Sequence, residues 1–346
     1  MTDFYRGKRV LVTGHTGFKG TWLTRILVNA GAQVCGYSRC SEKDPSLFAL
    51  SGVEKEIVHI KGDVRDYQHL QEVFCDFRPE IVFHLAAQPI VRESYAQPLE
   101  TYGTNVMGTA NVLECIRHTP SVESAVIITT DKVYRNNEWP WGYRENDILD
   151  GFDPYSNSKS CAELVTAAYK RSFPGLPPIS TARAGNVIGG GDFAKDRIIP
   201  DCVRAVSKGE PILVRNPNSV RPFQHVLEPL SAYLLIAEKQ AETPSLAGSY
   251  NIGPEDGDCV TTGRLVTLFC EKWGAGAQWI DKSEPGAPHE AGFLKLDCSL
   301  VKKTFAWQPR WTVEQAVEET VRFEKLRLDG VDTAGEMAAE IREFLA

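Results

Sequence analysis

The sequence predicts an α/β protein in which a doubly wound parallel sheet carries a smaller, interleaved C-terminal lobe. Two observations support this fold class. Apolar, strand-like runs alternate with helical patterns through the first half of the chain, and a glycine-rich turn separates the first strand from the first helix. Strands that are buried on both faces are continuously apolar, as they are here. The alternation therefore indicates strand–helix–strand units and a sheet covered on both faces.

Five strands and three helices are expected before residue 130. The strands cover residues 9–12, 33–37, 57–61, 81–85 and 124–129, and the helices surround residues 22–27, 67–77 and 99–117. The helical segments place apolar residues three or four positions apart, which is the period of one helix face. This order predicts a parallel sheet with its crossover helices.

The alternation loosens after about residue 180. A strand at 212–215 and helices at 201–207, 313–326 and 336–345 are separated by long connections, including a proline-containing stretch at 285–288. We expect residues 1–182 to form the first domain, with roughly 220–255 returning to it. Residues 183–346 are expected to form mainly the second lobe.

Composition excludes several classes of function. The 346 residues carry a net charge of −7, which argues against generic binding to nucleic acid or anionic membranes. The nine cysteines lack zinc-site spacing and are expected to be reduced thiols, so no metal site is predicted. No stretch reaches the about 18 consecutive apolar residues that a spanning helix needs. A cytoplasmic protein is expected.

The first strand runs directly into the turn TGHTGFKG. Gly14, Gly17 and Gly20 follow one another at three-residue intervals, with Thr16 and Phe18 between them. Glycines at this place allow a tight turn and let backbone N–H groups approach a pyrophosphate at the helix N-terminus. The spacing is a variant of the usual G-x-G-x-x-G, and its position between strand and helix favours a Rossmann-type dinucleotide site over a purely structural turn.

The residues alone leave the choice of dinucleotide open. The second strand ends in Ser38 and Arg39, where an acid would be typical of NAD and a base of NADP. Arg39 could accept a 2′-phosphate, stack on adenine or stay solvated. Asp63, at the end of the third strand, could accept a hydrogen bond from the adenine amino group or cap a helix.

A second pattern places Tyr155 and Lys159 four residues apart in a helical segment, so that both side chains share one face. A tyrosine of pKa about 10 is a poor base at neutral pH. A nearby ammonium stabilises the phenolate, so we expect Lys159 to lower the pKa of Tyr155. The same lysine could hold a cofactor ribose.

These segments resemble the extended short-chain dehydrogenase/reductases, the NAD-dependent epimerase/dehydratase family, over essentially the whole chain. The matching motifs are TGHTGFKG, HLAAQ (84–88), TNVMGT (104–109) and YSNSK (155–159). The stretches TTDKVY (129–134), WGYREND (141–147), RAGNVIGGGD (183–192) and RPFQHVLEPL (221–230) are further similar to the CDP-glucose branch of the nucleotide-sugar 4,6-dehydratases. The related dTDP- and GDP-sugar dehydratases usually have an Asp-Glu pair where this chain has Asp131 and Lys132. Phe223 stands where a tryptophan is usual in the CDP-glucose branch.

The resemblance implies NAD as a recycled cofactor and CDP-glucose as the substrate. Val64, Leu85, Ala86 and Ala87 are then expected to line the cofactor together with the glycine turn. In many relatives the helix at 99–117 and the helix of Tyr155 form an intersubunit bundle, so a homodimer or larger homo-oligomer is expected.

A 4,6-dehydratase oxidises C4, eliminates water across C5 and C6, and reduces C6, which implies roles for five residues. Tyr155 would take the C4 hydroxyl proton, assisted by Lys159 and a hydrogen bond from Thr130. We hypothesise that Asp131 is the acid at O6 and neutral Lys132 the base at C5. Burial would raise the pKa of Asp131 and lower that of Lys132, provided that the two do not form an ion pair. An exposed surface pair is the alternative.

An acidic protein needs a local basic pocket for a nucleotide diphosphate. Arginine forks suit phosphate oxygens, and the second lobe is expected to provide them. The candidates are Arg197, Arg215, Arg221 and His225, and the resemblance adds Asn186 near the pyrophosphate and Gln88 and Arg92 beside the sugar. Any of these arginines could instead be a surface residue, and His225 could be structural.

Two other functions remain open. An epimerase of the same fold would need Tyr155, Lys159 and a hydroxyl, and would leave Asp131 and Lys132 without a role. A non-catalytic NAD-binding sensor is the second alternative, although such proteins often lose the tyrosine or the lysine.

Overall fold

The structure is a computed structural model that describes residues 2–39, 45–283 and 292–346. The expected connection at 285–288 lies outside the described residues. Within the described residues no helix is long and apolar enough to cross a membrane.

The centre of the fold is a seven-stranded sheet with the order β11-β6-β5-β4-β1-β2-β3. Every neighbouring pair in it is parallel. The strands are β1 (Arg9–Thr13), β2 (Gln33–Ser38), β3 (Val58–Lys61), β4 (Ile81–His84), β5 (Ser124–Ile128), β6 (Ile179–Ala184) and β11 (Ser249–Ile252). The strand order reverses between β1 and β4, which is the arrangement of a doubly wound sheet.

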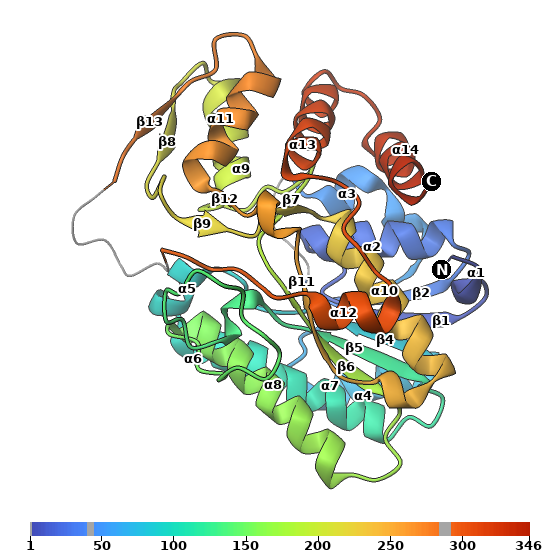
Figure 1. The fold of residues 1–346 in the computed structure, drawn as a ribbon. Coiled ribbons are helices and arrows are strands. Elements are labelled where there is room, and N and C mark those ends of the chain that lie inside the picture. Colours follow the sequence, from blue (N-terminus) through green and yellow to red (C-terminus); the bar gives the residue numbers. More distant parts are fainter. Residues whose placement is uncertain (1, 40–44, 284–291) are drawn as a thin grey trace.

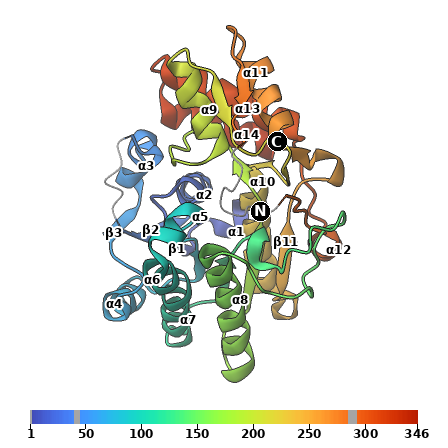
Figure 2. The ribbon, with the colours of Figure 1, turned by 90° about the vertical axis from the view of Figure 1, so that its left-hand side faces the viewer.

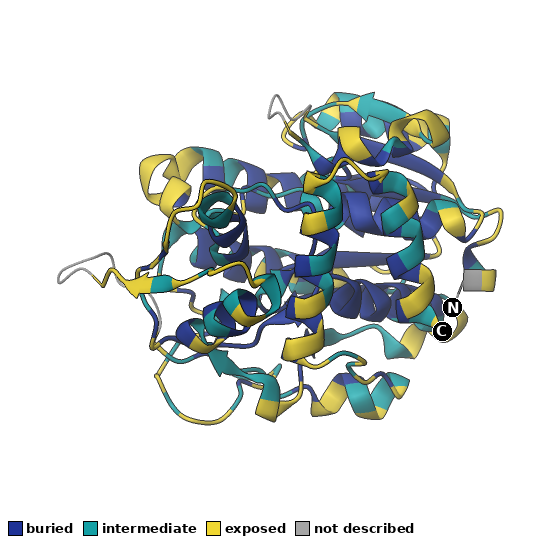
Figure 3. Ribbon diagram, turned by 90° about the horizontal axis from the view of Figure 1, so that it is seen from above, coloured by how far each residue is buried: buried dark blue, intermediate teal, exposed yellow. Residues whose placement is uncertain are grey.

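Helices cover both faces of this sheet, as Figures 1 and 2 show. On one face α2 (Phe18–Asn29) and α10 (Leu227–Glu242) bury Trp22 and Leu230 against the strands. On the other face lie α4 (Tyr67–Phe77), α7 (Gly108–Arg117) and α8 (Pro154–Ser172). Viewed from above, buried residues concentrate in the sheet and on the inner sides of the helices (Figure 3). The predicted fold class is confirmed.

A second lobe has its own core. It contains α9 (Ile198–Ser207), β8 (Ile212–Val214), α11 (Thr262–Trp273), β13 (Trp279–Asp281) and α13 (Val313–Leu328). Ile212, Phe269 and Val317 are fully buried within it. The chain leaves this lobe to add β11 to the main sheet. It later adds α12 (Ser299–Phe305) beside β11 and α14 (Thr333–Leu345) against α2.

Shorter elements complete the structure. The helical segments are α1 (Thr2–Tyr5), α3 (Leu47–Ser51), η1 (Val53–Glu56), α5 (Val91–Ala96), η3 (Asp131–Val133), η4 (Pro244–Leu246) and η5 (Asp256–Asp258). The short strands are β7 (Val187–Ile188), β9 (Val220–Arg221), β10 (Gln224–His225) and β12 (Val260–Thr261).

The helix expected at 99–117 is confirmed as one continuous helical run, but its middle is π-helical. That region consists of α6 (Pro98–Tyr102), a π-helical segment η2 (Gly103–Met107) and α7. Side-chain periodicity does not reveal this change in backbone hydrogen bonding. The terminal helix begins at Thr333, earlier than expected, because the Asp332 side chain accepts from the N–H groups of Ala334 and Gly335 and caps it.

Parallel strands bring their carboxyl ends to one edge of the sheet. At this edge β1 leads into Gly14, β4 into Leu85, β5 into Thr129 and β6 into Gly185. Ligands of open α/β sheets bind outside the carboxyl ends, at the point where the strand order reverses. The glycine turn and the TTDK segment therefore lie on the same edge.

Candidate active site

The glycine turn is packed so closely that side chains would not fit. Gly14 has φ +74°, and a Cβ there would lie 2.7 Å from the backbone nitrogen of Ala86. A Cβ on Gly20 would overlap the carbonyl of Gly14. Gly17 caps α2 without any side-chain hydrogen bond to the first helical N–H groups. This cradle fits the pyrophosphate of a dinucleotide, which would accept from those groups.

Two arginines and two carboxylates form ion pairs near the end of β2. The Arg39 guanidinium lies 2.6 Å from a carboxylate oxygen of Glu100 and 4.0 Å from Asp63. Arg65 pairs with the same two carboxylates, and this interaction lowers the pKa of Asp63. The Thr16 and Ser38 hydroxyls are 2.8 Å apart beside them. A 2′-phosphate here would face two carboxylates, so the surroundings of Arg39 disfavour NADP.

Thr130 and Asp131 lie buried at the end of β5. The Thr130 hydroxyl donates a 2.9 Å hydrogen bond to Oδ1 of Asp131. Oδ2 of Asp131 has no hydrogen-bond partner among the described residues. Burial raises the pKa of Asp131, opposed by Lys132, Thr130, Arg221 and Lys19. A buried carboxyl with one free oxygen and a raised pKa is suited to donate a proton.

Tyr155 and Lys159 begin α8, where Asp153 caps the helix and Pro154 takes its first position. The expected lowering of the tyrosine pKa by Lys159 is wrong for this structure. Burial raises the pKa of Tyr155 to about 12, and a hydrogen bond with Thr130 lowers it only in part. The Lys159 ammonium instead donates a 3.0 Å hydrogen bond to the carbonyl of Ile128.

Burial lowers the pKa of Lys159 to about 8, opposed by Glu163 one turn further along the helix. Lys132 is half-buried beside Asp131 and makes no ion pair with it. The two neighbouring groups are therefore free to serve different atoms of a ligand.

Lys19 belongs to this site, although no pattern predicted it. It follows Gly17 and Phe18 on α2 and lies close enough to Asp131, Lys159 and Arg197 to interact electrostatically with each. Its ammonium lies 3.5 Å from the Tyr233 hydroxyl. Burial lowers the pKa of Lys19 to about 7. Its place in the glycine turn was the feature in the sequence that could have revealed it.

The predicted arginines fall into two groups. Arg197 pairs with Asp192 at 2.9 Å and interacts with Tyr155, and buried Arg221 interacts with Asp131, so both border the catalytic residues. Arg92 and Arg215 are more exposed. They converge on the carboxylate of Asp196, at 3.5 and 3.0 Å.

His225, expected to be either a substrate contact or a structural histidine, lies in a structural position. Its side chain is fully buried, 3.0 Å from the Glu340 carboxylate and beside the rings of Trp22 and Trp311. It joins α14 to the core. The Glu340 carboxylate gives the buried imidazole a polar partner, which offsets the cost of removing it from water.

Gln88 uses its amide inside the protein. Nε2 donates to the carbonyl of Ile90 and the hydroxyl of Thr101, and Oε1 accepts from the Ile90 N–H at 2.6 Å. These bonds indicate that Gln88 shapes the loop after β4 rather than offering its amide to a sugar. Asn186, which follows β6, is half-buried between Gly185 and β7.

Gly185 is a further residue that the sequence analysis missed. A Cβ here would lie 2.6 Å from Cγ of Pro222 and 3.2 Å from Oδ2 of Asp131. Because this space is so narrow, the absence of a side chain lets the β6 edge and the Pro222 loop close over Asp131. Glycine at 185 therefore leaves room for the free carboxyl oxygen.

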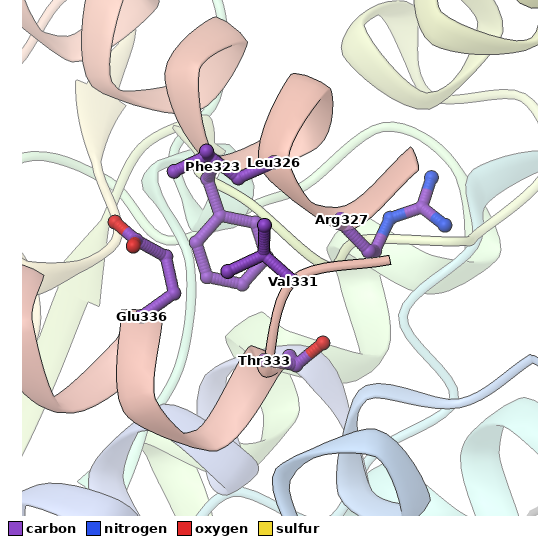
Figure 4. A pocket seen from close by; sticks show the side chains of 6 residues that line it. All are labelled: Phe323, Leu326, Arg327, Val331, Thr333 and Glu336. Carbon is purple, nitrogen blue, oxygen red and sulfur yellow. The ribbon is translucent and has the colours of Figure 1, made fainter. Parts of the chain in front are cut away.

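A small hollow between α13 and α14 lies apart from these residues. Figure 4 shows the ring of Phe323 at its centre. It is lined by Phe323, Leu326, Arg327, Val331, Thr333 and Glu336, none of which is a candidate residue. The candidate site remains the edge of the sheet.

Comparisons with known proteins show that the sequence of this chain is similar to nucleotide-sugar 4,6-dehydratases. A family model described as GDP-mannose 4,6 dehydratase matches residues 11–320. CDP-glucose 4,6-dehydratase of Salmonella typhimurium is 45% identical, over 99% of this chain and 98% of the relative. dTDP-glucose 4,6-dehydratase of Haemophilus influenzae is 26% identical, over 91% of this chain and 97% of the relative.

Solved structures show the same fold. Thermus thermophilus UDP-glucose 4-epimerase, a complex with NAD, gives a TM-score of 0.80 at 25% identity and covers 92% of this chain and 99% of that one. dTDP-glucose 4,6-dehydratase from Bacillus anthracis, in complex with NAD, gives 0.79 at 20% identity, with 94% and 99% covered. The glycine cradle, the Tyr155–Lys159 helix and the family match over most of the chain together show that this chain belongs to the GDP-mannose 4,6-dehydratase family.

Proposed function

We propose that the chain is an NAD-dependent hydro-lyase that converts CDP-D-glucose into CDP-4-dehydro-6-deoxy-D-glucose and water. The observation that carries the proposal is the cluster of Thr130, Asp131 and Lys132 around Tyr155. Oxidation alone would need neither the buried acid nor the adjacent amine. The identity to the Salmonella typhimurium relative supports CDP-glucose as the substrate.

NAD, when bound in the glycine cradle, supplies a reversible acceptor for the hydride of C4. Tyr155 takes the proton of the C4 hydroxyl in its phenolate form, which the positive charge of Arg197 favours against the effect of burial, and Thr130 orients that oxygen. The ketone at C4 makes the C5 proton acidic, so Lys132 removes it while Asp131 protonates the departing C6 hydroxyl. Lys132 then returns a proton to C5 as the hydride reaches C6. Each positioned proton-transfer group contributes about 10²–10⁴ in rate.

The surroundings of the site fit a nucleotide diphosphate. Arg197 and Arg221 border the catalytic residues from the second lobe, and Arg92 and Arg215 form an outer pair around Asp196. The guanidinium fork binds phosphate oxygens in a bidentate manner. We assign the inner pair to the diphosphate and the outer pair to the entrance of the site.

A homodimer is part of the proposal. Leu99, Met107 and Leu164 lie on α6, η2 and α8 and are 87%, 57% and 55% exposed. Large apolar side chains exposed on neighbouring helices are typical of a surface covered by a partner. Light scattering of the purified protein tests this association, and a monomer at working concentration would contradict it.

We place the enzyme in the cytoplasm, where NAD and reduced thiols are available.

The test is an activity panel with CDP-, dTDP-, GDP- and UDP-glucose and with GDP-mannose. We expect a 4-keto-6-deoxy sugar from CDP-glucose, detected by its absorbance in alkali. An epimer without loss of water would instead show an epimerase. Binding of NAD without any product from the panel would show a non-catalytic protein.

A further inference from the structure

The segment 292–297, which precedes α12, lies between the loop that follows Lys132 and the second lobe. It pairs in parallel with Tyr143 of that loop and with Val220 of β9. In Figure 1 the segment runs beneath β9 toward α12. It therefore joins the edge of the sheet that carries the candidate site to the strand that carries Arg221.

Glu138 holds the start of this segment. Its carboxylate accepts from two consecutive backbone N–H groups, those of Gly292 at 2.9 Å and of Phe293 at 2.7 Å. Nδ2 of Asn136 donates to the carbonyl of Phe293 at 3.1 Å. Hydrogen bonds to an ionised acceptor are stronger than those between neutral groups. Glu138 also has φ +53°, a conformation that residues other than glycine rarely adopt and that is often found at functional sites.

The same segment holds the peptide group that precedes Arg221. The N–H of Val220 donates to the carbonyl of Gly292 at 2.9 Å, and the N–H of Leu294 donates to the carbonyl of Val220 at 3.2 Å. That carbonyl also accepts from Nη1 of Arg221 at 2.9 Å. Hydrogen bonds thus connect the Glu138 carboxylate, through this segment and Val220, to the Arg221 guanidinium.

The orientation of the Arg221 guanidinium depends on this support. Arg221 is 6% exposed, and a guanidinium fork binds two phosphate oxygens at once only when its edge faces them. The Val220 carbonyl holds one end of the fork, so the orientation of that peptide group determines where the fork points. The segment 292–297 holds the peptide group by two hydrogen bonds, and Glu138 holds the segment.

We propose that Glu138 is a positioning residue for nucleotide binding, which holds the segment 292–297 so that the Arg221 fork meets the diphosphate of the nucleotide sugar. The inference rests on the proposed function, which assigns that diphosphate to Arg197 and Arg221. Glu138 acts through Arg221 and has no role of its own at the reacting atoms. Because Glu138 belongs to the loop that follows Lys132, the nucleotide grip and the catalytic segment share one support.

The experiment measures the binding of CDP by calorimetry to NAD-loaded wild type, Glu138→Ala, Arg221→Ala and the double variant. CDP carries the diphosphate and does not react. We expect Glu138→Ala to weaken CDP binding by about tenfold, which lies within the coupling found inside one hydrogen-bond network. In the Arg221→Ala background the same change should have no further effect, because the group through which Glu138 acts is gone. A merely structural Glu138 would weaken binding in both backgrounds.

Asp147→Ala is the matched control. The Asp147 carboxylate accepts from the N–H of Arg144 at 2.8 Å, so this variant removes a similar hydrogen bond within the same loop. Its affinity for CDP should equal that of wild type. Kinetics with CDP-glucose give a second measurement, in which the KM of Glu138→Ala should rise by a larger factor than its kcat falls. The reverse order would place Glu138 in the chemical steps and contradict its action through Arg221.

A CDP affinity of Glu138→Ala within about twofold of wild type, or an equal loss in the Arg221→Ala background, overturns the proposal. Should Arg221→Ala fail to fold, Arg221→Met removes the guanidinium, keeps more of the packing and takes its place. A wild type that binds CDP and forms no product from CDP-glucose would refute the dehydratase function alone. A wild type that does not bind CDP would refute both, so the failures are distinguishable.

Discussion

Glu163 and Arg183 form a buried ion pair directly beneath the catalytic edge of the sheet. Nη2 of Arg183 lies 2.9 Å from Oε2 of Glu163, and the two side chains are 3% and 1% exposed. The same carboxylate accepts from the hydroxyls of Thr129 and Thr181, at 2.5 and 2.7 Å. The pair thus ties α8 to β6 and to the residue that precedes Thr130.

Replacing Glu163 should destabilise the whole protein. Glu163→Leu leaves the Arg183 guanidinium buried without its carboxylate, which typically costs about 3–5 kcal/mol of unfolding free energy. Urea denaturation measures this loss. The matched control is Glu242→Leu, which removes one partner of an exposed ion pair at Lys239 and is expected to change stability little. Equal losses in both variants would contradict the role assigned to the buried pair.

Lys132→Gln should stop the reaction after oxidation of C4. Glutamine keeps the length of the side chain but cannot remove the C5 proton, so the reduced cofactor accumulates and is followed by its absorbance. We expect product formation to fall by about 10²–10⁴. Mass spectrometry of the recovered sugar in D₂O is decisive. Entry of deuterium at C5 at the wild-type rate would show that Lys132 is not the base.

Asp131→Asn should block the departure of the C6 hydroxyl and leave removal of the C5 proton possible. Deuterium from the solvent is then expected at C5 without any deoxy sugar, which distinguishes this variant from Lys132→Gln. The expected loss of turnover is again about 10²–10⁴. Retention of near wild-type turnover would refute Asp131 as the acid.

Lys19 should make stability depend on pH. Burial lowers its pKa to about 7, whereas an unfolded chain keeps a lysine near 10.4. Between these values the folded protein binds fewer protons than the unfolded chain, so stability rises with pH. The unfolding free energy of wild type, relative to Lys19→Met, should therefore increase from pH 7 to pH 10. A constant difference over this range would contradict the lowered pKa of Lys19 in the folded protein.

Gly20→Ala should weaken NAD binding. The added methyl group would overlap the Gly14 carbonyl, and neither backbone segment can yield without opening the turn. We expect at least a tenfold increase in the dissociation constant, measured by calorimetry. Gly257→Ala is the control, since its methyl group would meet nothing within 4 Å. Unchanged NAD affinity in Gly20→Ala would mean that the cofactor does not use this turn.

Much of the fold could be predicted from local patterns. The helix at 67–77 was predicted with its observed bounds, because apolar residues repeat along one face, and the structure shows that Asp66 caps its start. The five early strands were found within a residue or two, since buried parallel strands are continuously apolar. The π-helical segment at Gly103–Met107 was missed because it changes backbone hydrogen bonding and leaves the side-chain pattern intact.

The sequence by itself determined the fold class, the glycine turn and the Tyr155–Lys159 pair, because these depend on spacing within short segments, and its family resemblance singled out Thr130, Asp131 and Lys132. Only the tertiary structure decided which side chains share the site. In the fold, Lys19 on α2 lies near enough to Asp131 to interact with it electrostatically, and His225 lies beside the Glu340 carboxylate on α14. The fold also buries the Tyr155 side chain, and this burial raises the pKa of its phenol. The physical reason is that burial and charge pairing depend on residues far apart in the chain, and these set the protonation states on which the chemistry depends.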